Sequence, residues 1–183
     1  MLSAIVLSDA QGKPLRRDLR ARSRDADEVL VRTLASLVAP TIAGIIGDVV
    51  IAGAPSRDLE TIADHAGCGF VAAEGEDERL RRAIEAARRP QLLILRSGRV
   101  PEAGFIEEAE DFLALQKGEP LPPALLRAVP ENFFQRLFPS RAPIAGLLAS
   151  REICLLAPRG GLYELARFTR AKITLRTRAR RTD

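Results

Sequence analysis

The sequence predicts an α/β fold: a single domain whose mostly parallel sheet carries helices on both faces. Short apolar runs alternate with amphipathic segments over residues 1–115, and this alternation is typical of βαβ crossovers, which make neighbouring strands parallel. In the run 91–95 every residue from Leu92 to Leu95 is apolar, as in a strand that is buried on both faces. A hydrophobic content of 46% is ample for one packed core in a chain of 183 residues.

Strands and helices are expected to alternate through the first half of the chain. The expected strands lie at residues 2–7, 48–52, 69–73 and 91–95. Helices between them are expected to start at Asp25, Ser56 and Glu76, and to stop or bend at Pro40, Gly67 and Pro90 in turn. A polar, strongly basic stretch from about Gln11 to Arg24 is predicted to be a loop or a frayed helix.

The second half of the chain is less regular. The elements expected there are a helix at 105–113, a rigid turn or linker at 117–123, a strand at 153–157, a helix at 162–168 and an alternating segment at 173–177. The single histidine, His65, is expected near a helix end, where the helix dipole favours a cation. Cys68 and Cys154 have no metal-ligand spacing and are interpreted as small core or near-core residues.

Basic side chains are concentrated at the C-terminus. Residues 167–183 contain seven Arg and Lys against one Asp, a net charge of +6, so residues 1–166 carry −2 of the chain's +4. We therefore expect a domain over 1–166 and a separate basic segment over 167–183, because terminal basic runs are often disordered. With 4% aromatic residues and no Trp, the chain has few side chains on which bases could stack, and nucleic acid is not expected as a partner.

A short segment between Pro130 and Pro139 gathers the residues Phe133, Phe134, Leu137 and Phe138. These side chains either pack onto the sheet, or contact an anionic membrane or a second copy of the chain. No apolar run approaches the roughly 20 residues that cross a bilayer, and the N-terminus lacks the basic start of a signal peptide. A cytoplasmic location is expected, with the inner membrane face as the place of any peripheral contact.

Common catalytic and cofactor motifs are missing from the sequence. There is no Gly-x-Gly-x-x-Gly after the first strand, no phosphate-binding Gly-x-x-x-x-Gly-Lys-Ser/Thr and no Gly-x-Ser-x-Gly. The single histidine has no evident serine or cysteine partner, which speaks against nucleophilic hydrolase chemistry. No cofactor is predicted.

The order of the elements resembles the N-terminal half of family-2-type glycosyltransferases. These enzymes have the GT-A nucleotide-diphospho-sugar transferase fold, and this half of the fold is Rossmann-like. The segments that resemble the family's strands and helix motifs are 2–7, 30–37, 48–51, 56–63, 68–71, 83–95 and 101–106. Residues 56–63 are similar to the family's Ser-Thr-Asp-x-Thr-x-x-Ile-Ala, and 101–106 to its Pro-x-x-Gly-Trp-Leu. The resemblance covers 1–115 and implies a nucleotide-sugar or a nucleoside diphosphate as ligand.

The chain departs from the family at its acidic motifs. The family's acidic pair after the second strand, which contacts the nucleoside, falls at Gly53 and Ala54. Its metal-binding Asp-x-Asp falls at Arg96-Ser97-Gly98, with Arg99 just beyond. Divalent ions of this kind need oxygen ligands, and two arginines would repel them, so no metal site is predicted.

Arg96, Ser97 and Arg99 are the predicted ligand-binding residues. In one interpretation the two guanidinium groups replace the charge of the metal and stabilise a leaving diphosphate. In the other they are solvated at the strand end or pair with acidic residues that follow, which are Glu102, Glu107 and Glu108.

Two acidic residues are further candidates. Asp58 is either a ligand contact or a first-turn residue of its helix. Glu164, beside Gly160-Gly161 and Tyr163, is the candidate general base for an acceptor hydroxyl. The chain is interpreted as glycosyltransferase-like, with any activity metal-independent. The alternatives are a non-catalytic GT-A-like binding or regulatory module and a basic-tailed protein associated with nucleic acid or membrane.

Overall fold

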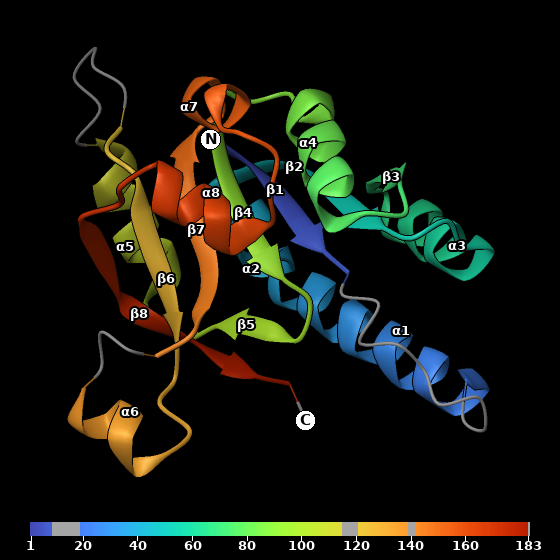
Figure 1. Ribbon diagram of the computed structural model, residues 1–183, viewed down its shortest axis with the longest axis horizontal. Helices are drawn as coiled ribbons and strands as arrows, with labels where there is room; N and C mark the ends of the chain where they lie inside the picture. The colour runs from blue at the N-terminus through green and yellow to red at the C-terminus, as the bar shows by residue number, and fades with distance from the viewer. Residues whose placement is uncertain (9–18, 115–120, 139–141, 183) are drawn as a thin grey trace.

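The computed structural model describes residues 1–8, 19–114, 121–138 and 142–182 (Figure 1). Its strands form one sheet in the order β3-β2-β1-β4-β7-β6-β8-β5. They are β1 (Leu2–Leu7), β2 (Ile46–Gly53), β3 (Gly69–Ala72), β4 (Gln91–Arg96), β5 (Arg99–Pro101), β6 (Ala124–Ala128), β7 (Ile144–Ser150) and β8 (Ile173–Arg181). The helices are α1 (Leu19–Ser36), α2 (Val38–Ile42), α3 (Arg57–Ala66), α4 (Glu76–Ala86), α5 (Phe105–Ala114), α6 (Phe133–Leu137), α7 (Arg151–Leu156) and α8 (Leu162–Phe168).

The sheet has a parallel half and a mixed half. β3, β2, β1 and β4 pair in parallel, as the alternation of strands and helices predicts. β7 is antiparallel to both β4 and β6, β8 is parallel to β6, and β5 is antiparallel to β8. The predicted α/β fold with a mostly parallel sheet is therefore confirmed, and every antiparallel pairing involves β7 or β5.

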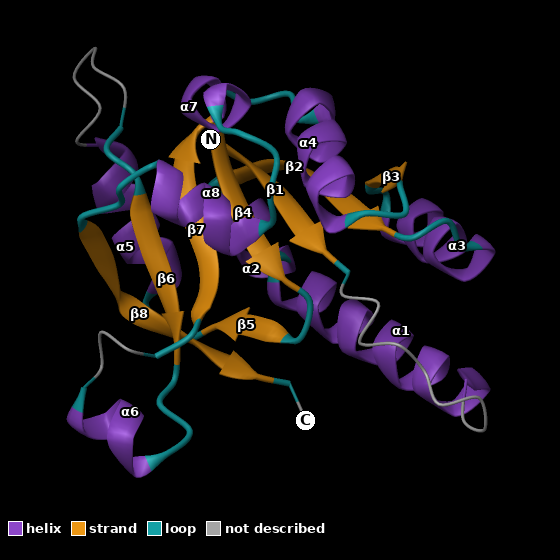
Figure 2. Cartoon of the chain, viewed as in Figure 1, coloured by secondary structure: helices purple, strands orange, loops and turns teal. Residues whose placement is uncertain are grey.

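Helices cover both faces of the sheet (Figure 2). Alternate residues of one strand serve opposite faces: Leu93 and Leu95 of β4 join the core under α1, α3 and α5, whereas Leu92 and Ile94 join the core under α4, α7 and α8. Because both faces are covered, β4 is apolar from Leu92 to Leu95, and these four residues are fully buried.

Helix α3 has the ends that its sequence predicts. The Ser56 hydroxyl accepts a hydrogen bond from the Leu59 amide at 3.4 Å, which satisfies one of the unpaired N–H groups of the first turn. Gly67 ends the helix with φ at +65°, a left-handed conformation that glycine adopts without a Cβ penalty. His65 lies exposed in the last turn, as expected.

Helix α1 starts earlier than predicted. It begins at Leu19 rather than Asp25, because the alanine and arginines of the basic stretch are strong helix formers that extend the helix. The chain between β1 and Leu19, at 9–18, lies outside the described residues. Pro40 does not end α1, which stops at Ser36. Pro40 lies in the first turn of α2, where its missing N–H is tolerated.

The prediction of a strand at 153–157 is wrong. These residues belong to α7, whose first turn is capped by the Ser150 hydroxyl, an acceptor for the Ile153 amide at 3.3 Å. The periodicity of a short apolar run cannot distinguish a strand from a buried helix. Here the Ser150 cap favours the helix.

Much of the basic C-terminal segment is a strand of the sheet. β8 lies between β6 and β5, and its Leu175 and Ala179 are buried. Glu108 of α5 fixes it: one carboxylate oxygen accepts from the Arg176 amide at 2.6 Å and the other from the Thr177 amide at 2.8 Å. Residues 173–181 are therefore ordered in the sheet, in contrast to the disorder typical of terminal basic runs.

The aromatic segment forms α6, and it does not pack onto the sheet. Phe133 and Phe134 are each 73% exposed, and Leu137 and Phe138 are exposed as well. Figure 1 shows α6 set apart from the other helices. Of the alternatives drawn from the sequence, packing of these side chains onto the sheet is wrong, because the α6 segment projects beyond the carboxyl end of β6. Among the described residues, no helix combines the length and the apolar character that a membrane span requires.

Candidate functional site

An open cleft lies at the edge of the sheet where β4 and β6 end and β7 begins. Its volume is about 610 Å³. In open α/β sheets ligands gather outside the carboxyl ends of the strands, which is where this cleft lies. The residues that line it are Arg96, Leu125, Arg127, Ala142, Pro143, Ile144, Leu162, Tyr163, Ala166 and Arg167.

Arg96 is the last residue of β4, and its guanidinium is held at the cleft by Glu76. Arg96 Nη2 donates to Glu76 Oε1 at 3.1 Å. The same carboxylate oxygen accepts from the Leu162 amide at 3.2 Å. Glu76, at the start of α4, therefore ties the end of β4 to the start of α8 and positions Arg96.

The turn after Arg96 is fixed by backbone hydrogen bonds. The Ser97 amide donates to the carbonyl of Leu7 at 2.9 Å, and the Gly98 amide donates to the Thr33 hydroxyl at 2.9 Å. Gly98 has φ at +80°, a conformation that side chains rarely adopt. The apolar run followed by Arg-Ser-Gly-Arg is thus a strand that turns sharply at the sheet edge.

Arg99, which follows the turn, contacts a different part of the chain from Arg96. Arg99 Nη1 donates to Glu131 Oε1 at 2.8 Å, in the segment that leads to α6. Arg96 lines the cleft, and Arg99 is not among the residues that line it. Both arginines pair with acids, but not with the predicted ones, which were Glu102, Glu107 and Glu108. Their partners come from helices and loops distant in sequence.

The cleft is electropositive. Arg127 of β6 and Arg167 of α8 line it together with Arg96, and none of the described residues that line it is acidic. A concave surface lined by charges of one sign focuses the electrostatic field and attracts the opposite charge. The arrangement suits an anionic ligand. Sequence reasoning missed Arg127 and Arg167 as cleft residues, because neither follows a recognisable motif.

Asp58 and Glu164 lie outside this cleft. Asp58 is exposed in the first turn of α3. Burial, and then the charge of Asp58, raise the pKa of the nearby Asp27. Glu164 Oε2 accepts from the Gly161 amide at 3.0 Å and so caps α8. The structure thus brings Arg96 to the cleft, and Ser97, Arg99, Asp58 and Glu164 are not among the described residues that line it.

One of the two positions of the missing acidic pair, Gly53, is closely packed. A Cβ on Gly53, at the end of β2, would lie 2.6 Å from Leu59 Cδ1 and 3.5 Å from the Phe70 ring. A missed residue lies nearby: Arg79 of α4 is buried, and its Nη1 donates to the carbonyl of Ser8 at 3.3 Å. The sequence signal that could have found Arg79 is its position four residues before Ala83, on the apolar side of the helix.

The β4 end does not fit a divalent cation. Such ions require several oxygen ligands, and this position offers the guanidinium of Arg96, the Ser97 hydroxyl and a glycine. The carboxylate of Glu76, which contacts Arg96, is engaged by that arginine. Within the described ranges, no three His, Cys, Asp or Glu side chains come together in a way that could hold a metal ion.

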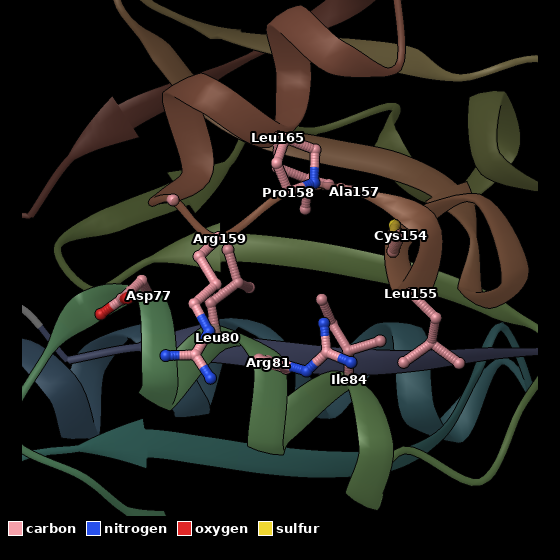
Figure 3. Close-up of a pocket in the computed structure, with 11 residues that line it drawn as sticks. Asp77, Leu80, Arg81, Ile84, Cys154, Leu155, Ala157, Pro158, Arg159 and Leu165 are labelled. Atoms are coloured by element: carbon pink, nitrogen blue, oxygen red, sulfur yellow. The ribbon is translucent and has the colours of Figure 1, made fainter.

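A second, much smaller crevice lies beside α4 and α7 (Figure 3). Its volume is about 20 Å³, enough for a single water molecule. Cys154 lines it, and burial raises the pKa of this thiol to about 12. A thiol that stays protonated is a poor nucleophile, so the crevice is a packing feature and Cys154 is the core residue that was predicted.

No protein-family model matches the sequence, and no curated protein does. Several solved structures share the fold. Glucosyl-3-phosphoglycerate synthase from Mycobacterium tuberculosis, in complex with Mn²⁺, UDP and glucosyl-3-phosphoglycerate, superposes with a TM-score of 0.60 at 15% identity, over 100% of this chain and 72% of that one. Mannosyl-3-phosphoglycerate synthase from Rubrobacter xylanophilus gives 0.56 at 15% identity, over 94% and 64%.

A third structure is HddC from Yersinia pseudotuberculosis, with a TM-score of 0.53 at 10% identity, over 87% of this chain and 81% of that one. The chain thus spans between 64% and 81% of the lengths of these three structures. At these identities the likeness concerns the fold. The nucleotide-diphospho-sugar transferase-like fold that the resemblance predicts is present.

Proposed function

We propose that this chain binds a nucleotide-sugar or a nucleoside diphosphate at the carboxyl end of β4, and that any glycosyl transfer it performs needs no metal. The observation that carries the proposal is Arg96, a cation that lines an anion-attracting cleft at the strand end where the fold's relatives are expected to hold their metal. Solved structures of this fold contain UDP, UDP-glucose or GMP-PN, which supports a nucleotide as ligand.

Arg96 suits the charge that develops in glycosyl transfer. An acceptor hydroxyl oxygen bonds to the anomeric carbon, the bond from that carbon to the diphosphate breaks, and the electron pair leaves with the diphosphate. A guanidinium binds two phosphate oxygens in parallel and stabilises this negative charge in place of a divalent ion. Because Glu76 and the start of α8 fix the guanidinium, little reorganisation is needed.

The acceptor hydroxyl must lose a proton to a base. Glu164 stays the predicted base, with its neighbour Tyr163 lining the cleft. Its carboxylate must leave the Gly161 amide to act, because the cap holds it. Ser97, next to Arg96, stays a predicted ligand contact, and so do Arg99 and Asp58.

A non-catalytic binding module is the second candidate function. It is favoured by the absence of a carboxylate among the described residues that line the cleft. Release of nucleoside diphosphate from a panel of UDP- and GDP-sugars, measured in EDTA, separates the two. Metal-free turnover that Arg96→Ala abolishes supports the transferase. Binding without turnover by any panel member supports the module.

A further inference from the structure

The α6 segment presents an exposed apolar tip, which consists of Phe133, Phe134, Leu137 and Phe138. The tip stands beyond the carboxyl end of β6, apart from the other helices (Figure 1). The Asn132 side chain accepts from the Gln135 amide at 2.9 Å and caps the helix. The apolar side chains therefore project from a formed helix.

The chain that enters α6 runs beside the end of β8. The Val129 amide donates to the carbonyl of Ala179 at 2.9 Å. Two residues later, Glu131 accepts from Arg99 Nη1 at 2.8 Å, and Arg99 is the register partner of Arg181. Because β8 is parallel to β6, both strands end at the same edge of the sheet. The last residues of β8 thus lie at the edge from which the apolar tip projects.

This edge is strongly basic. Arg136 of α6 and Arg180 and Arg181 of β8 are all exposed. Seven arginines and one glutamate give a net charge of +6 to the segments that meet here, which are 99–101, 124–138 and 173–182. When the two glutamates that contact the backbone of β8 are included, Glu102 and Glu108, the net charge is still +4. The surface around the apolar tip is therefore complementary to an anionic partner.

A bilayer suits this surface better than a protein does. A stable protein–protein interface takes roughly 20 to 30 residues from each partner, whereas the apolar tip has four. The tip also protrudes, so a protein partner would need a matching hollow, but a fluid bilayer needs no matching shape. Peripheral proteins bind anionic membranes through aromatic and aliphatic side chains that enter the acyl boundary and basic side chains that stay at the headgroups.

We infer that the apolar tip and the arginines at the end of β8 dock the protein on an anionic membrane. The carboxyl edge of the sheet then faces the lipid. The cleft lies at the same edge, so docking brings it close to the bilayer surface. The inference does not depend on what the cleft binds.

A tryptophan reporter tests the inference, because the chain has no tryptophan of its own. In Phe134→Trp the indole replaces a ring that is 73% exposed, so the fold is expected to be kept and the emission in buffer to be that of a solvated indole. Vesicles that contain phosphatidylglycerol are expected to shift this emission to the blue, and brominated acyl chains in them are expected to quench it. Vesicles of phosphatidylcholine alone are expected to do neither.

Leu156→Trp is the matched control. Leu156 is 72% exposed at the end of α7, and α7 follows β7, which is antiparallel to β4. It therefore lies at the opposite edge of the sheet, and its emission is expected to stay unshifted and unquenched on the same vesicles. If Phe134→Trp does not fold, Phe133→Trp, at an equally exposed position, serves instead.

The role of the arginines is tested by combining Arg180→Gln with Arg181→Gln. Each basic residue at an anionic surface strengthens binding about fivefold, so this double variant is expected to bind the anionic vesicles about tenfold more weakly or worse. Arg81→Gln with Arg88→Gln removes the same charge from exposed positions on and after α4, and is expected to bind as the wild type does.

Three outcomes would overturn the inference: no blue shift of Phe134→Trp on anionic vesicles, equal quenching of Leu156→Trp, or unchanged binding when Arg180 and Arg181 are both replaced. A blue shift that appears without lipid and grows with protein concentration would overturn it as well, because a second copy of the chain would then cover the apolar tip. Nucleotide binding is measured separately on the same variants, so a failure of membrane docking leaves the proposed function standing.

Discussion

At the residue scale, Glu76 connects the candidate site to the fold. Its carboxylate holds both the Arg96 guanidinium and the Leu162 amide, so one side chain joins the ends of three elements, α4, β4 and α8. The contact is partly exposed, which limits its contribution to stability, but it sets the position of the one arginine on which the proposed function depends.

Replacing Glu76 by alanine is expected to lower the free energy of unfolding by about 1 kcal/mol and to weaken nucleoside diphosphate binding, because Arg96 loses its support. Urea denaturation and calorimetry measure the two effects. Glu78→Ala is the control, since Glu78 makes only an exposed i, i+4 pair with Arg82 and should change neither quantity appreciably. Equal effects of the two substitutions would contradict the positioning role of Glu76.

Glu108 makes stability depend on pH. Burial alone would raise the pKa of Glu108, but hydrogen bonds from Thr177 and the Arg176 amide, and the charge of Arg176, together hold it below its ordinary value of 4.5. A carboxyl whose pKa is depressed by folding contributes stability that is present above its unfolded pKa and is lost as the pH falls through its folded pKa.

The difference in unfolding free energy between wild type and Glu108→Gln is therefore expected to be full at pH 6 to 7, at most about 1 kcal/mol, and to shrink below about pH 4.5. Denaturation curves between pH 3 and 7 measure it. A difference that grows as the pH falls would show that the carboxylate does not stabilise β8.

At the element scale, α6 stands out because packing against the other described residues does not cover its aromatic side chains. Phe133 and Phe134 meet edge to face, with ring centroids 6.2 Å apart, yet both are exposed. Exposed aromatic side chains on one short helix are typical of a surface that contacts a membrane interface or a second protein. Membrane docking is the proposal for this surface, and self-association is its alternative.

The protein is expected to sediment with vesicles that contain phosphatidylglycerol, less so at high salt, because the aromatic side chains insert while basic residues contact the headgroups. A double variant, Phe133→Ser with Phe134→Ser, should lose sedimentation without losing thermal stability. Leu156→Ser, at a side chain that is 72% exposed on α7, is the matched control. Absence of salt-sensitive sedimentation in the wild type would refute membrane contact and leave a protein partner for α6.

The elements that sequence predicts well are those with local signals. Ser56 and Gly67 fix both ends of α3 through contacts within a few residues, and the apolar run of β4 needs only its own composition. The α7 helix was missed because its apolar run fits strand and helix equally. Exposure of the Phe133–Phe138 segment was missed because nothing local reports whether a tertiary neighbour covers it.

The residues of the candidate site, too, could be predicted only where the signal is local. Arg96 could be located from sequence because it directly follows a buried strand. Its partner Glu76 and the cleft residue Arg127 could not, since they depend on the order of β4, β7 and β6 and on their register. Contacts set by register between distant strands have no signature in one sequence.

At the scale of the whole molecule, the C-terminal strand joins the two parts of the mixed half-sheet. β8 pairs with β6 on one side and β5 on the other, and it closes the core over α5. The charge asymmetry of the sequence describes the exposed side chains of this strand, such as Arg176 and Arg180, rather than a free tail.

Deleting residues 167–183 is therefore expected to abolish cooperative thermal unfolding, because Leu175 and Ala179 leave the core and two strands lose their partner. Circular dichroism melting and light scattering measure this loss. A truncated chain that melts as the full chain does would show that the folded unit ends near residue 166.

We propose above that Arg96 binds a diphosphate without a metal. Calorimetric titration of UDP and GDP, in EDTA and again in Mn²⁺, tests it on the wild type, on Arg96→Ala and on Arg81→Ala, an exposed arginine of α4. We expect one nucleotide to bind the wild type and Arg81→Ala with the same affinity in both buffers, and to bind Arg96→Ala at least about tenfold more weakly. Binding that requires Mn²⁺, or that survives in Arg96→Ala, would contradict it.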